Sequence, residues 1–163
     1  LLHIMNHAIM KGGAFLCAGA IIMLVGTRDI KQMAGIGRRV PLLGISFGIF
    51  VLALAGTPPF NGFISKLFIC KAALGWDEWG SAIVLIVILN SFLSLFYYLP
   101  ALNKVLLAPQ PSEQVRSAAT EIPNVMVLAI FILAVLTLVF GVQPQLGLDL
   151  VDPAARFAST LVQ

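Results

Sequence analysis

Apolar residues gather into four long stretches, separated by shorter segments that hold most of the charges. The first stretch, residues 1–26, is long enough as a helix to cross about 30 Å of hydrocarbon at about 1.5 Å per residue. The same reasoning predicts membrane helices over residues 1–26, 41–75, 80–107 and 123–141. We therefore expect an all-α integral membrane protein with four crossings.

The second stretch differs from the others because it is too long for one ordinary crossing and is interrupted by AGTPPFNGF. Pro58 and Pro59 each lack a backbone donor, and Gly62 relaxes the chain just after them. The second crossing is therefore predicted to be a discontinuous helix, broken near residues 57–62. After the fourth stretch, residues 142–163 contain charges and prolines that prevent a further span, which predicts an interfacial C-terminal tail.

Composition supports a membrane protein and excludes several other classes. Hydrophobic residues make up 60% of the 163 residues and charged residues only 10%, far from the usual balance of soluble domains. The net charge of +3 reflects few acids and gives no support for nucleic-acid binding. Cys17 and Cys70 lack metal-ligand spacing, and no nucleotide-binding motif is present. We expect no cofactor and no metal in this chain.

Three ionisable residues lie in register on the first predicted helix. His3, His7 and Lys11 are spaced at i, i+4 and i+8, which places them on one helical face. Charged groups at membrane depth are costly, so such a stripe favours a proton path, since histidine titrates near neutral pH. The alternative is that these groups only form hydrogen bonds to neighbouring helices.

Two further sets of polar residues are candidates. Lys66 follows the predicted break directly, and broken helices often mark ion sites in transporters. Its alternative role is a packing helix whose lysine extends to the membrane surface. Asn90, Ser94 and Tyr97 share one face of the third predicted helix and are candidates to line the path, with interhelical packing equally plausible. The helix over 123–141 has Thr137 as its one polar residue inside the span and is expected to face lipid.

Four sequence segments, in this order, carry a resemblance to a known family: HxxxHAxxKxxxFLxAG, TRDIKQMAG, AGTPPFNGFISK and FYYL. The chain resembles the antiporter-like proton-translocating subunits of respiratory complex I, membrane-bound hydrogenases and Mrp-type cation/proton antiporters. That resemblance implies that His3, His7 and Lys11 line a central hydrophilic axis. It also implies that Lys66 belongs to an outward half-channel, and that the loop with Pro58, Pro59 and Gly62 is the break in that path.

One family feature has no match in this chain. Complete members carry an intramembrane glutamate paired with a lysine in their N-terminal half, whereas the acids of this chain lie outside the predicted spans. The chain also begins inside a predicted helix without an initiator Met. We therefore expect it to form the C-terminal half of such a subunit, or a split or degenerate form.

The resemblance implies part of a proton-translocating subunit coupled to a redox complex of complex I or membrane-hydrogenase type. Such a chain is a membrane subunit of a multi-subunit oxidoreductase, such as NADH:quinone oxidoreductase, with the redox site in other subunits. The expected partners are these membrane subunits, the lipid bilayer and protons, or sodium ions. An Mrp-type sodium/proton antiporter subunit and a non-conducting membrane scaffold are the two alternatives. Each places the chain in an energy-transducing membrane, expected to be a bacterial or archaeal cell membrane.

Basic residues predict the orientation of the four crossings. Residues 27–40 and 104–122 lie on the same side if the chain crosses four times, and they hold Arg28, Lys31, Arg38, Arg39, Lys104 and Arg116. The opposite side has Lys71 and Arg156. Because basic loops favour the cytoplasm, both of these segments are predicted to be cytoplasmic and the C-terminal tail non-cytoplasmic.

Cysteine labelling tests this orientation. Single cysteines replacing Gln32 and Gln145 are expected to react from opposite sides of the membrane, with position 32 reacting from the cytoplasm. The measurement is labelling of intact cells with a membrane-impermeant maleimide. Labelling of position 32, but not of position 145, from outside would show that the orientation is inverted.

Overall fold

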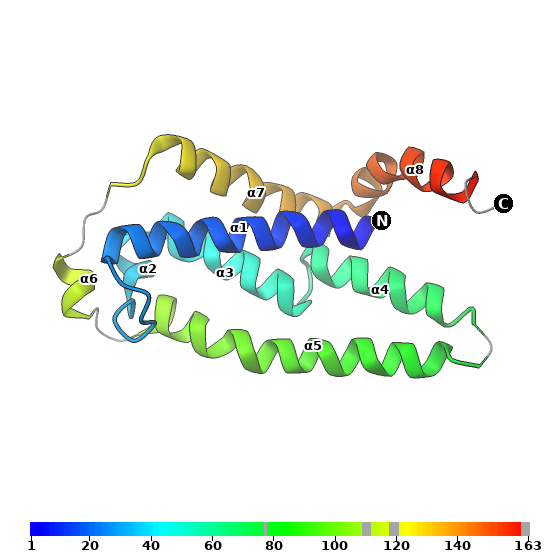
Figure 1. Ribbon diagram of the computed structural model, residues 1–163, viewed down its shortest axis with the longest axis horizontal. Helices are drawn as coiled ribbons and strands as arrows, with labels where there is room; N and C mark the ends of the chain where they lie inside the picture. The colour runs from blue at the N-terminus through cyan, green and yellow to red at the C-terminus, as the bar shows by residue number, and fades with distance from the viewer. Residues whose placement is uncertain (77, 109–111, 118–120, 161–163) are drawn as a thin grey trace.

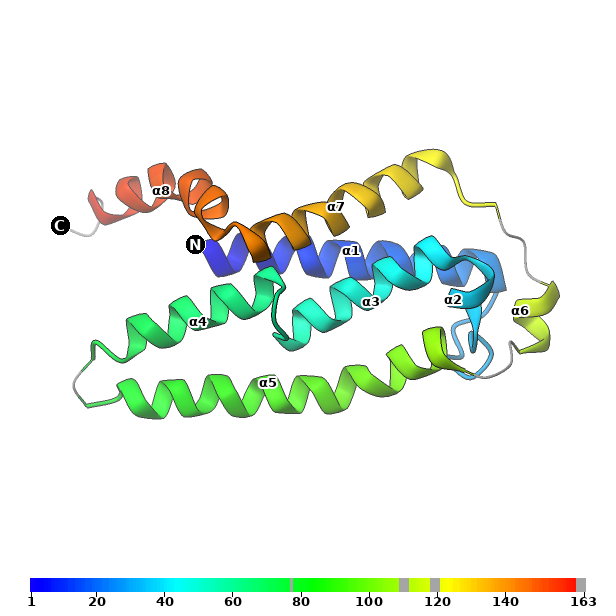
Figure 2. The same cartoon turned by 180° about the vertical axis from the view of Figure 1, so that it is seen from behind.

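The computed structural model describes the chain except residues 77, 109–111, 118–120 and 161–163, and the described part is helical with no strand. Figures 1 and 2 show elongated helices lying side by side. The elements are α1 Leu2–Val25, α2 Ile36–Arg39, α3 Pro41–Ala55, α4 Asn61–Ala73, α5 Gly80–Leu102, the π-helical turn Asn103–Leu107, α6 Glu113–Ser117, α7 Asn124–Val142 and α8 Pro144–Thr160.

Helix α1 lies at the centre of the bundle and contacts α3, α4 and α7. Helices α3 and α4 follow one another along α5, and α5 packs against both (Figure 2). By length and composition, three segments of the described chain can cross a membrane: Leu2–Val25, Gly80–Leu107 and Asn124–Val142. Helix α3 is apolar but shorter than these.

The apolar stretch 41–75 forms two helices, with residues 56–60 between them. Gly56 ends α3 in the left-handed conformation at φ 87°, and its N–H donates to the carbonyls of Leu52 and Ala53. Only glycine adopts this conformation routinely, so the residue type fixes where α3 stops. The chain then restarts as a helix at Asn61, and the last carbonyls of α3 are left without the helical partners that a continuous helix would supply.

The apolar core lies where α1, α3 and α7 meet. Cys17, Ile21, Phe50 and Ile130 are almost fully buried there. Gly13 makes room for the Phe50 ring, because a Cβ at Gly13 would lie 2.2 Å from a ring carbon. The α1 face that lies against α3 is therefore shaped by a small residue opposite a large one.

Helix α7 is not the purely lipid-facing helix that its apolar composition predicts. It contacts α1, α3 and α4, and Thr137 is fully buried on that side. The Thr137 hydroxyl donates to the carbonyl of Leu133 in the previous turn, at 2.8 Å, so its polarity is satisfied within the helix. The opposite face, with Leu128 and Phe131, is exposed.

The tail after α7 is mostly one helix, α8, which extends beyond the ends of α1 and α7 (Figure 1). Asp152 and Arg156 form an exposed i, i+4 ion pair at 2.7 Å, while Leu150 and Phe157 expose large apolar side chains. A helix with both kinds of exposed side chain suits a membrane surface, and an interfacial position for this tail stays a prediction.

A single methyl group tests the close packing at the break. A Cβ at Gly62 would lie 1.9 Å from the carbonyl oxygen of Ala53, whereas a Cβ at Gly12 meets nothing within 4 Å. Because a backbone carbonyl cannot move aside easily, Gly62→Ala is expected to lower stability by about 1–3 kcal/mol. The matched change Gly12→Ala is expected to be neutral or stabilising. Thermal unfolding in detergent measures both, and equal melting temperatures would contradict the packing.

Candidate functional site

Lys66 on α4 reaches back across the break and binds the end of α3. Its Nζ donates to the carbonyl oxygens of Leu54 at 3.2 Å and Ala55 at 3.1 Å. The last carbonyls of a helix have no intrahelical donor and form the negative end of the helix dipole. An ammonium group supplies both hydrogen-bond donors and a positive charge, so Lys66 caps helix α3, which ends before it.

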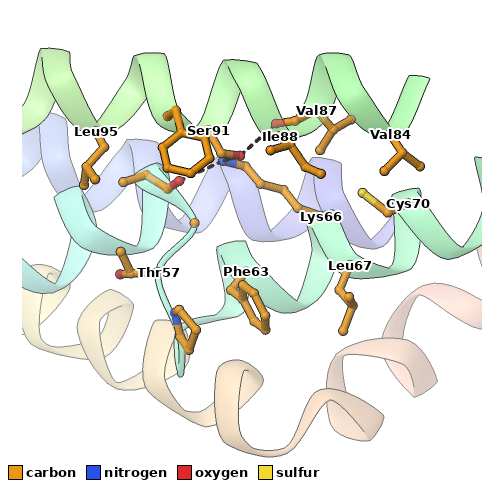
Figure 3. A pocket seen from close by; sticks show the side chains of 14 residues that line it. Thr57, Phe63, Lys66, Leu67, Cys70, Val84, Val87, Ile88, Ser91 and Leu95 are labelled. Carbon is orange, nitrogen blue, oxygen red and sulfur yellow. Dashed lines mark hydrogen bonds between the residues drawn. The ribbon is translucent and has the colours of Figure 1, made fainter. Parts of the chain in front are cut away.

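The same ammonium group also contacts α5. Lys66 Nζ lies 3.1 Å from the hydroxyl oxygen of Ser91, which in turn donates to the carbonyl of Val87 at 2.9 Å. Figure 3 shows the lysine side chain running from α4 towards Ser91, with both bonds drawn. The three hydrogens of one ammonium are thus directed at α3 and α5, and one charge joins three helices.

Gly56 makes this arrangement sterically possible. A Cβ at this position would lie 2.9 Å from Lys66 Nζ and 3.1 Å from its Cδ. The residue therefore has two reasons to be glycine: its left-handed backbone ends α3, and its missing side chain leaves the space that the lysine occupies.

A cavity of about 510 Å³ opens beside Lys66, between the break and α5. Its wall is largely apolar, and Thr57, Lys66 and Ser91 supply the polar side chains (Figure 3). The Thr57 hydroxyl donates to the carbonyl of Leu52 at 2.9 Å, so it is bound to the end of α3 as well. The polar groups of the cavity are concentrated at the break.

The two histidines of α1 lie on the other side of α4. His3 Nδ1 is 2.9 Å from the hydroxyl oxygen of Ser65, and the His3 and His7 rings have centroids 5.8 Å apart. Ser65 directly precedes Lys66 in α4. The structure therefore brings His3 to the first turns of α4, where Lys66 also lies, and places the His7 ring beside His3.

Lys11 occupies a separate place. Its side chain is exposed and lines a cavity of about 400 Å³ between α1, α3 and α5, together with Tyr97 and Tyr98. Leu54 also lines this cavity, while its carbonyl accepts from Lys66 on the other side. The end of α3 thus separates the two lysines.

The predicted residues of α5 do not gather around Lys66. Asn90, Ser94 and Tyr97 line a cavity of about 530 Å³ on the outer side of α5, and Tyr97 is 78% exposed. The Ser94 hydroxyl donates to the carbonyl of Asn90 at 2.7 Å, within the helix. Tyr97 alone reaches the Lys11 cavity as well. A pathway role for these three residues stays a prediction.

Four polar residues at the site were missed from the sequence: Asn6, Asn61, Ser65 and Ser91. Each stands next to a residue that was selected, or one turn from it, so proximity to His3, Gly62, Lys66 or Asn90 was the available signal. Asn6 and Asn61 are almost fully buried, and the Asn6 Nδ2 donates to the backbone carbonyl of Asn61 at 3.2 Å.

The side chains at the site suit the exchange of protons. They offer an ammonium, two imidazoles, hydroxyls and amides, and within the described residues no three His, Cys, Asp or Glu side chains come together as a metal site would require. Imidazole and amine groups each gain and lose one proton at nitrogen, and hydroxyls can pass a proton between them.

Known proteins of one family match most of this chain in sequence. The profile of a family described as "NADH:quinone oxidoreductase/Mrp antiporter, TM" matches residues 1–94. The Na⁺/H⁺ antiporter subunit A1 of Staphylococcus saprophyticus is 31% identical over 168 residues, which cover 96% of this chain and 20% of the relative. Subunit A1 of Staphylococcus aureus strain Newman is 34% identical over 166 residues, covering 94% and 20%.

A solved structure also resembles this chain. A chain of respiratory complex I from Thermus thermophilus with bound aureothin has a TM-score of 0.72 and 26% identity, and the match covers 91% of this chain and 33% of that chain. The chain described here spans about one fifth of the length of the curated relatives named above.

Removing the Lys66 ammonium is expected to weaken the bundle. Lys66→Met keeps an unbranched side chain one atom shorter but leaves the Leu54 and Ala55 carbonyls without their donor, at a cost of about 1–3 kcal/mol. Lys71→Met, on the exposed part of the same helix, is the control and is expected to be neutral. The measurement is the melting temperature of the purified protein in detergent. Equal melting temperatures for the two variants would show that Lys66 does not stabilise the contact between α3 and α4.

Proposed function

Because this chain belongs to the family of NADH:quinone oxidoreductase/Mrp antiporter membrane subunits, we propose that it forms part of a subunit that translocates protons across the membrane. In this proposal, transport is coupled to a redox complex of complex I or membrane-hydrogenase type, whose other membrane subunits are its partners. The likeness to a complex I chain supports that coupling. The redox centres belong to partner subunits, and this chain needs no cofactor of its own.

In this proposal the polypeptide chain crosses the membrane four times. Helix α3 has 15 residues and spans about 22 Å, which is too short for about 30 Å of hydrocarbon, so α3 and α4 together form the discontinuous second crossing. Helices α1, α5 and α7 form the others, and α8 lies in the non-cytoplasmic interface. The exposed Trp76 and Trp79, between α4 and α5, support a membrane boundary at that end, since tryptophan favours interfaces.

The observation that carries the proposal is the bonding of Lys66 to the free carbonyls of the break. Those carbonyls hold a positive charge inside the bundle, and His3 of α1 contacts Ser65, the residue before Lys66. Protons pass along His3, His7 and Lys11, through bound water, to Lys66. A proton on one group repels a proton on the next, so that the charges advance in sequence rather than accumulate.

A second candidate function is that of an Mrp-type sodium/proton antiporter subunit. The observation that favours it is the identity of 31% and 34% to Na⁺/H⁺ antiporter subunits A1. Purification of the native assembly separates the two candidates. Iron–sulfur or hydrogenase subunits in the purified complex support the redox-coupled function, whereas small hydrophobic partners without redox centres support the antiporter.

A non-conducting scaffold is the third function that the chain could serve. In that case the ionisable groups only hold helices together, as the capping role of Lys66 on α3 allows. The double change Lys11→Ala and Lys66→Ala separates a scaffold from a transporter. Unchanged pumping by a fully assembled complex would support the scaffold.

Substitutions at Lys11 test proton transfer directly. Lys11→Ala is expected to abolish or strongly reduce translocation, and Lys11→Arg is expected to impair it too, because a guanidinium stays protonated near neutral pH. A purely structural lysine would tolerate arginine better than alanine. The measurement is proton uptake by proteoliposomes that contain the whole parent complex, with subunit content checked by gel. Wild-type pumping by assembled Lys11→Ala would contradict the proposal.

A further inference from the structure

Asn6 of α1 and Asn61 of α4 are in contact where the two helices pack together, and both residues are buried. Asn6 on α1 is 1% exposed, and Asn61, the first residue of α4, is fully buried. The Asn6 Nδ2 donates to the Asn61 backbone carbonyl at 3.2 Å, which joins the two helices. One turn away on each helix, His3 and Ser65 make a second polar contact between the same elements.

Three polar atoms of this pair have no hydrogen-bond partner among the residues that the structure describes. They are Asn6 Oδ1, Asn61 Oδ1 and Asn61 Nδ2, and all three are fully buried. Leaving a buried polar atom unpaired costs about 1–3 kcal/mol, and native proteins commonly satisfy such groups with internal water. Three unpaired atoms on two residues that a hydrogen bond joins therefore point to a ligand at this contact.

The mixture of donors and acceptors identifies the ligand. Two of the atoms are amide oxygens that accept, and one is an amide nitrogen that donates. A bare cation is bound by acceptors alone and an anion by donors alone. Water both donates and accepts, so it fits the whole set.

The site lies between the histidines and the break. His7 follows Asn6 directly in α1, and His3 lies one turn before it. On the other side, Gly62 sits so close to the carbonyl of Ala53 that a Cβ would lie 1.9 Å from it. The start of α4 therefore packs against the same end of α3 whose next two carbonyls accept from Lys66.

We propose that Asn6 and Asn61 bind a buried water molecule, and that this water passes protons from the histidines of α1 toward the broken segment. The second clause rests on the proposed function, whereas the first does not. The water accepts one proton from one side and releases one to the other, so it ends unchanged. The amides stay neutral throughout and orient the water.

X-ray radiolytic labelling of the intact protein in its membrane tests the water itself. A bound water gives hydroxyl radicals in place, so a neighbouring buried side chain is oxidised rapidly. Met10 is 1% exposed, and its sulfur would lie 2.9 Å from a Cβ at Gly62; Met33 is buried elsewhere and serves as the reference. Met10 is expected to be oxidised several-fold faster than Met33. Equal or slower oxidation of Met10 in the wild-type protein would overturn the proposal.

Replacing both amides gives the matched experiment. Asn6→Leu with Asn61→Leu removes the polar atoms at similar volume and is expected to bring Met10 oxidation down to the rate of Met33. The control Thr137→Val removes a buried hydroxyl that is already bonded within its own helix, and it is expected to leave Met10 oxidation unchanged. Unchanged Met10 oxidation in the double leucine variant would also overturn the water site.

Proton transport by the assembled complex tests the second clause. The double leucine variant is expected to lose transport several-fold, with normal subunit content, while Thr137→Val transports at the wild-type rate. Full transport by an assembled double leucine variant would overturn the relay. If Lys11→Ala also transports normally, the proposed function itself has failed, and the radiolytic result still decides whether the water is present.

Discussion

The bonding of the Lys66 ammonium to the end of α3 is the interaction on which the rest of the site depends. Breaking a helix inside a membrane exposes carbonyls that neither lipid nor the helix itself can satisfy. Lys66 donates to two of them and contacts Ser91 on α5 with its remaining hydrogen. The cost of the break and the cost of burying the charge therefore offset each other.

The geometry around this contact leaves little freedom. Gly56 must adopt a left-handed conformation and must also leave room for the lysine. Gly62 brings the start of α4 against Ala53, and Gly141 of α7 approaches the backbone of Pro59 so closely that a Cβ would lie 2.2 Å from its oxygen. Three glycines thus hold α3, α4 and α7 together at the break, and the polar side chains are positioned by that packing.

Much of this was predictable from the sequence. The apolar stretches predicted the long helices because their length matches a bilayer, and the prolines and glycines predicted a break where the structure has residues 56–60 between α3 and α4. That α3 and α4 form one discontinuous crossing stays a prediction. A shared pathway for His3, His7 and Lys11, expected from helical spacing, stays a prediction, because Lys11 lines a different cavity from the one beside Lys66. The buried face of α7 was not predictable, because its composition is apolar on every side and its single buried hydroxyl bonds within its own helix.

The partners of Lys66 were also beyond the sequence. On α5, spacing alone favoured Asn90, Ser94 and Tyr97, yet the rotation of the helix directs Ser91 toward the lysine instead. That rotation is fixed by packing against α3 and α4, which no local pattern encodes. Asn6 and Asn61 were passed over for a similar reason, since a lone amide in an apolar helix gives no sign of the partner it will meet.

The measurement that tests the central role of Lys66 most directly is proton transport by the assembled parent complex with Lys66→Arg. Arginine keeps the positive charge and can still donate to the carbonyls of Leu54 and Ala55, so the break and the assembly are expected to persist. A guanidinium does not release its proton near neutral pH. If Lys66 carries protons as well as capping α3, the assembled variant will not transport them. Wild-type transport by that variant would show that Lys66 only holds the helices together.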